Sequence, residues 1–139
     1  MSINNTEIIS VDFSEPKYIK LNVKQGDNGF RHFVFNCTNK GAPVAIDSET
    51  MYAVLKLKRP DGAYVINECT ILSNGNIDVE IKETITKNPG VCTAELVLFE
   101  RTKVADKNLP DESPPANTIS TMNIIINVFP SAIDNCELE

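Results

Sequence analysis

The sequence contains no tryptophan, one histidine and no cluster of lysine or arginine residues. Its thirteen basic residues are outnumbered by nineteen acidic ones, which gives a formal net charge of −6. Proteins that bind nucleic acid usually present a basic face, and anionic membranes repel an acidic surface. The composition therefore argues against both of these partners.

Long apolar runs are also missing. No run approaches the ~20 residues that a membrane-spanning helix needs. The first residues of the chain lack the basic and apolar regions of a secretory signal peptide. We therefore expect the protein to be made and to fold in the cytosol.

The four cysteines, Cys37, Cys69, Cys92 and Cys136, include no Cys-x-x-Cys pair. A zinc site or a disulfide framework would need closer spacing and more histidine than the single His32. Cys69 and Cys92 share parity with the apolar residues of their segments, which predicts that both point into the core as reduced thiols.

What the sequence does contain is strand-like alternation between turns. The turn Gly26–Gly29 leads into a segment in which Phe33 and Phe35 alternate with Val34 and Asn36. Glycine and asparagine tolerate the positive φ of tight turns, and period-two alternation is typical of a half-buried strand. Together with Phe30 the segment holds three of the nine aromatic residues, which predicts a central core strand.

The same alternation recurs along the chain, separated by turn formers such as Pro60-Asp61-Gly62. It predicts an all-β fold, an antiparallel sandwich or barrel of about seven or eight strands. We divide the chain into an arm or edge strand (1–16), the sandwich domain (17–130) and a C-terminal tail (131–139). The charged, proline-containing segment 101–118 is either a mobile loop, which we favour, or a segment that orders against a partner.

No combination of residues predicts catalysis, a metal site or a bound cofactor. Asp78 and Glu80 share a strand face, but Lys82 continues that face, which is typical of a solvated exterior. His32 has no nucleophile in a suitable context, and we interpret it as a surface or partner-facing residue. Asp27 lies in no calcium-binding loop pattern and more simply hydrogen-bonds its own turn.

One family resemblance follows from a series of motifs that are individually weak but ordered. The chain carries Gly26-Asp27, Arg31-x-Phe33-x-Phe35, Gly41-x-Pro43, Arg59-Pro60-Asp61-Gly62, Cys69-Thr70-Ile71, Pro89-Gly90, Ala94-Glu95-Leu96, Ile119-Ser120-Thr121, Ile126-x-Val128 and Asp134-Asn135. Over about residues 19–135 this series resembles the N-terminal domain of phage baseplate upper proteins, from tailed phages and prophages of Gram-positive bacteria.

The resemblance implies an immunoglobulin-like β-sandwich with a structural role in the virion and no catalytic residues. In that family the domain attaches to the tail hub through the distal tail protein, and downstream segments of longer members hold the receptor-binding protein. We therefore hypothesise a non-enzymatic module of the tail baseplate, assembled in the host cytoplasm, and leave a homo-oligomer open.

The residues that we expect at the interface lie in loops. They are Asp27, Asn28, Asp61, Arg101, Lys103, Asp106 and Lys107. The alternative function is a carbohydrate-binding or adhesion sandwich that uses Tyr52 or Tyr64. A hydrolase with Asp78 and Glu80 in a cleft ranks third.

Overall fold

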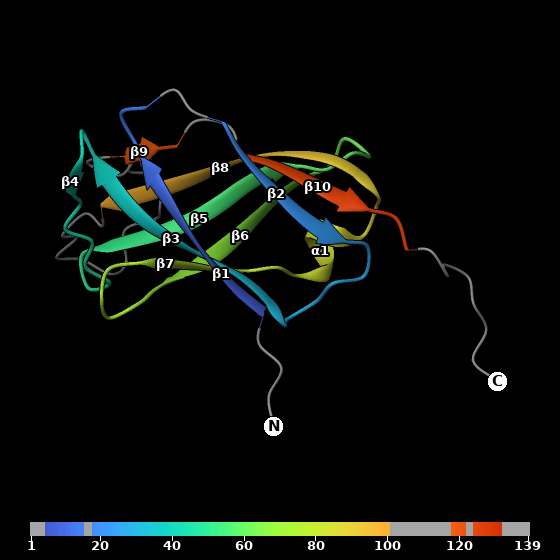
Figure 1. Cartoon of the computed structure of the whole chain (residues 1–139), viewed down its shortest axis with the longest axis horizontal. Helices are drawn as coiled ribbons and strands as arrows, with labels where there is room; N and C mark the ends of the chain where they lie inside the picture. The colour runs from blue at the N-terminus through green and yellow to red at the C-terminus, as the bar shows by residue number, and fades with distance from the viewer. Residues whose placement is uncertain (1–4, 16–17, 101–117, 122–123, 132–139) are drawn as a thin grey trace, which may run out of the picture.

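The computed structural model describes residues 5–15, 18–100, 118–121 and 124–131 (Figure 1). Within these residues nearly all of the regular secondary structure is β-strand. The elements are β1 (Asn5–Asp12), β2 (Ile19–Lys24), β3 (Arg31–Asn39), β4 (Ala42–Pro43), β5 (Met51–Lys58), β6 (Tyr64–Ile71), β7 (Ile77–Glu80), α1 (Glu83–Thr86), β8 (Gly90–Glu100), β9 (Thr118–Ser120) and β10 (Ile124–Phe129).

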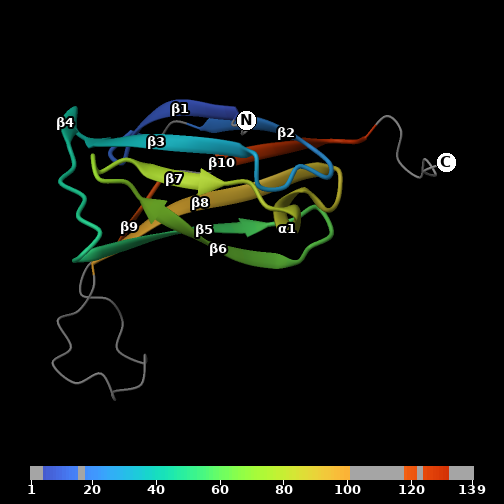
Figure 2. The same ribbon diagram turned by 90° about the horizontal axis from the view of Figure 1, so that it is seen from below.

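The strands form one curled sheet in the order β1-β3-β7-β6-β5-β8-β10-β2, with β4 beside β3 and β9 beside β8. The sheet bends at β6, which pairs with β5 along most of its length and with β7 at Thr70 and Ile71. Because the sheet curls, its two edge strands β1 and β2 lie on the same side of the molecule (Figure 2). They do not pair with each other. We call the gap between them the seam.

The prediction of an all-β fold is confirmed, but that of a purely antiparallel sheet is wrong. Both edge strands run parallel to their neighbours, β1 to β3 and β2 to β10. Alternation of side chains shows which residues face the core and carries no information about the direction of the neighbouring strand. After β1 the chain crosses to the opposite edge of the sheet, where it forms β2, and then returns to form β3 beside β1. A long connection of this kind allows β1 and β3 to pair in parallel. The immunoglobulin-like arrangement implied by the resemblance stays a prediction.

The predicted central strand does lie in the core. Phe33 and Phe35 of β3 are 2% and 0% exposed, and they pair across the sheet with Val79 and Ile77 of β7. Burying a large aromatic side chain removes 150–250 Å² of surface from water, so such pairs dominate core stability. The apolar face of β8 and β10 closes the other side of the core, with Leu96 and Ile126 among its buried residues.

The last predicted strand, 120–128, is two strands, β9 and β10, whose registers on β8 differ by one residue. Val97 of β8 pairs with Ser120, and Ala94 of β8 pairs with Ile124. Between these two pairs β8 advances three residues, whereas the segment opposite it advances four. This one-residue difference in register reverses the alternation of the side chains between β9 and β10, so one pattern could not describe both strands. Just past β9, Thr121 Oγ1 accepts a hydrogen bond from the Leu96 N–H at 3.1 Å.

The cysteines that the structure describes are free thiols. Cys92 and Cys37 are buried, and Cys69 is half-buried against the core, which confirms the inward placement of Cys69 and Cys92. Burial raises the pKa of Cys37 and of Cys69 to about 12, and it also raises the pKa of Cys92. Cys136 lies outside the described residues.

Candidate interface surfaces

Three of the predicted interface residues lie in the loops around α1. Asp27, in the turn between β2 and β3, forms an ion pair with Arg31 at 2.9 Å and accepts a hydrogen bond from the Lys24 N–H at 2.9 Å. Its own carbonyl accepts a hydrogen bond from Thr86 Oγ1 at 2.7 Å, which ties the turn to α1.

Asn28, the next residue of that turn, caps α1 from outside the helix. The residue at the helix N-cap position, Lys82, provides no side-chain cap. Asn28 Oδ1 accepts the hydrogen bond of the Glu83 N–H at 3.0 Å, so one of the unsatisfied donors of the first turn is paired. The cap comes from a residue 55 positions away in the sequence, which local patterns could not reveal.

Asp61 lies in a second loop, between β5 and β6, and orients the arginine that joins this loop to the same helical turn. Its carboxylate receives two hydrogen bonds from Arg59, at 3.1 and 2.8 Å, and this pairing lowers the pKa of Asp61. Arg59 also donates to the Thr84 carbonyl at 3.2 Å. Beside it, Gly90 approaches Pro60 so closely that a Cβ on the glycine would lie 2.9 Å from the proline Cβ.

The structure thus gives Asp27, Asn28 and Asp61 a shared role that the sequence did not predict, which is to fasten two loops to α1, in the case of Asp61 through Arg59. Their role at an interface stays a prediction. Arg101, Lys103, Asp106 and Lys107 lie outside the described residues. The sequence did not predict the roles of Arg59 and Thr86 in these contacts. The Arg-x-Asp spacing was a usable signal for Arg59, because the two side chains can meet across a tight turn.

His32 is half-buried and pairs with the acids that we expected on a solvated face. Its Nδ1 lies 2.9 Å from Asp78 Oδ1, and its Nε2 lies 3.2 Å from the Gly29 carbonyl and 3.9 Å from Glu80. Both ring nitrogens are therefore engaged with protein groups. Among the described residues no group of three or more histidine, cysteine, aspartate or glutamate side chains could hold a metal ion.

The two tyrosines of the carbohydrate alternative do not form one platform. Tyr64 is 79% exposed on β6, near the exposed Ile66. Tyr52 is half-buried and stacks on Phe99 with ring centroids 4.8 Å apart. Tyr64 pairs with Lys58, six residues along β5 from Tyr52, so the backbone positions of the two tyrosines are roughly 20 Å apart along the strands.

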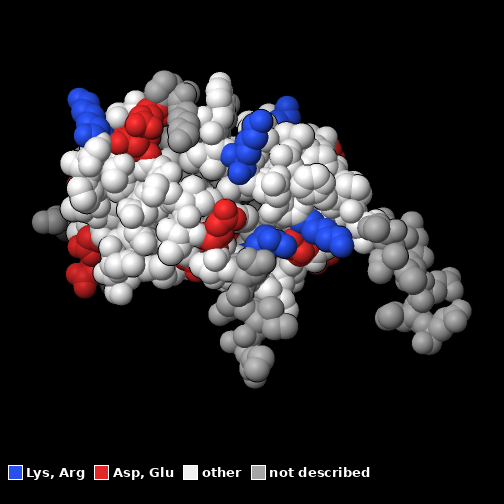
Figure 3. All heavy atoms as spheres, in the orientation of Figure 1, with Lys and Arg blue, Asp and Glu red and all other residues white. Residues whose placement is uncertain are grey.

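Charges are mixed on the surface. On the face shown in Figure 3, basic and acidic side chains are interspersed, and neither sign forms a continuous patch. Contact surfaces on this face would therefore rely on local complementarity rather than on a strong one-sign field. No helix in the described residues is long and apolar enough to cross a membrane.

At the other end of the sheet Asp12 fixes the end of β1. Its Oδ1 accepts hydrogen bonds from the N–H and hydroxyl of Ser14 and from the Lys40 N–H, at 2.8, 2.6 and 3.1 Å. Its Oδ2 accepts from the Thr38 hydroxyl at 3.0 Å and from the Gly41 N–H at 2.8 Å. These hydrogen bonds hold the pKa of Asp12 well below its usual range. One carboxylate therefore joins β1 to the β3–β4 turn.

This anchor predicts a specific acid sensitivity. Because the pKa of Asp12 is depressed in the folded state, its contribution to stability is complete above the unfolded pKa of about 3.9 and declines as the pH falls below it. We expect the stability difference between the wild type and Asp12→Asn to be larger at pH 6 than at pH 3, measured by urea unfolding. Glu68→Gln, on the exposed side of β6, is the control, and an equal difference at both pH values would contradict the anchor.

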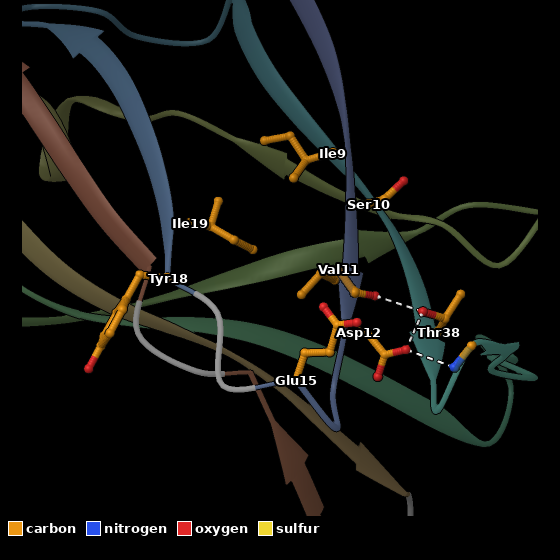
Figure 4. Close-up of a pocket in the computed structure, with 9 residues that line it drawn as sticks. Ile9, Ser10, Val11, Asp12, Glu15, Tyr18, Ile19 and Thr38 are labelled. Atoms are coloured by element: carbon orange, nitrogen blue, oxygen red, sulfur yellow. Dashed lines mark hydrogen bonds between the residues drawn. The ribbon is translucent and has the colours of Figure 1, made fainter.

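Between the edge strands lies a groove of about 510 Å³, which we call the seam groove. It is lined by Ile9, Ser10, Val11, Asp12, Glu15, Tyr18, Ile19, Thr38 and Gly41. Figure 4 shows Ile9 and Val11 projecting from β1, and Ile19 from β2, into the gap between the strands. The groove therefore has an apolar floor, and Glu15 lies at one end of it.

Comparison with known proteins yields one family and a similar solved structure. Residues 4–135 match the family model described as the BppU N-terminal domain. The N-terminal domain of phage TP901-1 ORF48 is similar in structure, with a TM-score of 0.56 over 90% of this chain and 98% of that domain, at 14% sequence identity. At this identity the likeness shows the fold alone. No curated protein sequence matches the chain significantly.

Proposed function

This chain belongs to the BppU N-terminal domain family, that of phage baseplate upper proteins, and we propose that it attaches to the central hub of the tail through protein–protein contacts. The observation that carries the proposal is the extent of the family match, which spans residues 4–135 and so nearly the whole chain. The domain is a phage baseplate structural module. The distal tail protein is the proposed hub partner, and a receptor-binding protein would be connected only indirectly.

The architecture suits such a role. A curled sheet with loops fastened to α1 presents surfaces whose shape changes little on binding, which reduces the entropy lost in association. Several large apolar side chains are exposed on it, including Ile8, Phe30, Ile66 and Phe129. Exposed apolar groups inside a polar rim are typical of contact surfaces. Segment 101–118, with Arg101, Lys103, Asp106 and Lys107, remains a proposed contact.

Co-purification tests the attachment. We would express the tagged domain together with the tail proteins encoded beside it and measure the mass of the eluted complex by light scattering. We expect a complex of defined stoichiometry with a tail-hub protein. If the folded domain binds none of the soluble tail proteins, the attachment is wrong, whereas the fold and the family remain. An unrelated all-β domain of similar net charge is the control for nonspecific capture.

One observation favours the carbohydrate alternative enough to test it, namely the exposed ring of Tyr64 beside Ile66. Stacking on a sugar needs an exposed aromatic face. Binding to a glycan array that is lost in Tyr64→Ala and kept in Tyr52→Ala would support this function. No glycan binding by the folded domain would exclude it.

A further inference from the structure

A hydrogen bond just past the end of β1 shows which backbone groups of this strand form no hydrogen bond with β3. The Phe13 N–H, just past β1, donates to the Thr38 carbonyl of β3 at 2.9 Å. Backbone direction alternates along a strand, so the odd-numbered residues of β1 face β3 and the even-numbered ones face away. The N–H and C=O groups of Ile8 and Ser10 therefore point into the seam.

The same reasoning applies to β2. The Gln25 N–H donates to the Phe129 carbonyl at 2.8 Å. The backbone N–H and C=O groups of the odd-numbered residues of β2 therefore point to β10, and those of Lys20 and Asn22 point into the seam. The C-terminal end of this edge is closed, because Lys24 exchanges hydrogen bonds with Asp27 at 2.9 and 3.0 Å. Within the described residues no strand pairs with the open part of either edge.

The charged residues that line the seam groove indicate which kind of ligand could bind there. Among the residues that the structure describes, the charged ones that line it are Asp12 and Glu15, and none of these lining residues is a lysine or an arginine. Lys20 belongs to β2, but its side chain is exposed and lies on the face opposite to Leu21 and Val23. The Asp12 carboxylate is already occupied by five hydrogen bonds. Glu15 is exposed and therefore offers a negative charge to a ligand.

We propose that the seam takes up an extended segment of a partner protein as an added β-strand, whose apolar side chains meet the groove floor and whose lysine or arginine pairs with Glu15. The strand would use the free backbone groups of Ile8 and Ser10, as in other cases of strand addition to a sheet edge. Contact with Ile9, Val11 and Ile19 then supplies apolar burial. The inference rests on the proposed function, because it names the kind of segment through which a tail partner would bind.

A matched pair of substitutions tests the seam. Ser10→Pro removes the N–H that points into the seam and leaves the odd-numbered groups paired with β3, whereas Ser10→Ala keeps the N–H. The probe is a synthetic peptide of about seven residues that alternates valine and lysine, the length of an ordinary strand. By nuclear magnetic resonance titration we expect saturable binding by the wild type and Ser10→Ala. For Ser10→Pro we expect affinity about tenfold weaker, the loss of roughly one hydrogen bond.

A second variant keeps the test informative if Ser10→Pro unfolds. Glu15→Lys leaves the backbone of β1 intact and reverses the charge at the end of the groove. We expect it to weaken the valine–lysine peptide and to favour a peptide that alternates valine and glutamate. The inference is overturned if the valine–lysine peptide does not bind the wild type, or if it binds Glu15→Lys equally well.

Repeating the co-purification with Ser10→Ala and Glu15→Lys separates the two proposals. A complex that forms equally with both variants supports hub attachment and contradicts the seam. Peptide binding at the seam without any hub complex supports the seam and contradicts the attachment. A doubling of mass for the isolated domain, abolished by Glu15→Lys, would show that the occupant is a second copy of this chain, which contradicts a separate partner.

Discussion

Replacing Phe35 by alanine is expected to lower the free energy of unfolding by about 4 kcal/mol. The side chain is fully buried and faces Ile77 across β3 and β7 and Ile9 across β1 and β3. Its removal leaves a cavity that a close-packed core cannot fill, and the cavity adds to the lost transfer free energy. Urea unfolding followed by circular dichroism measures the change directly.

The matched control for this substitution is Phe30→Ala. Phe30 belongs to the same aromatic segment but is 60% exposed. Truncating it removes little buried area, so we expect a change within about 0.5 kcal/mol. If the two substitutions destabilise the protein equally, β3 is not the strand on which the core is built.

Gly90→Ala should be the next most damaging substitution, with an expected loss of about 3 kcal/mol. Two effects add at this position. Gly90 has a φ of 130°, which side chains rarely adopt, and an added Cβ would lie 2.9 Å from the Cβ and 3.0 Å from the Cγ of Pro60. The clash would push the Pro60 turn away from the start of β8. Thermal and urea unfolding would report the loss.

Gly62→Ala separates the two effects. Gly62 also has a positive φ, of 87°, but no atom lies within 4 Å of a Cβ built there. We expect only the conformational cost of about 1 kcal/mol. Equal losses in Gly62→Ala and Gly90→Ala would show that the approach to Pro60 does not constrain the fold. Pro60→Gly combined with Gly90→Ala should recover part of the loss, since it removes the clashing ring.

The candidate surfaces were less predictable than the strands, for a reason that Asn28 and Asp12 illustrate. The sequence marks Asn28 as a turn residue, but its hydrogen bond to Glu83 joins residues that only the folded sheet brings together. Asp12 carries a local signal, the Asp-x-Ser spacing of a side-chain turn, which accounts for its bonds to Ser14. Its bonds to Lys40 and Gly41 depend on the parallel pairing of β1 with β3.

By itself the sequence determined the strand-forming segments, the turns at glycine, and the inward faces that carry Phe33, Phe35 and Cys92. The turns depend on local backbone preference, and the strands and their inward faces depend on the period of burial. The order of motifs also predicted the family. Only the tertiary structure decided strand direction, the change of register between β9 and β10 and the seam between β1 and β2. These depend on which segments meet across the sheet, and an alternating pattern satisfies parallel and antiparallel neighbours equally well.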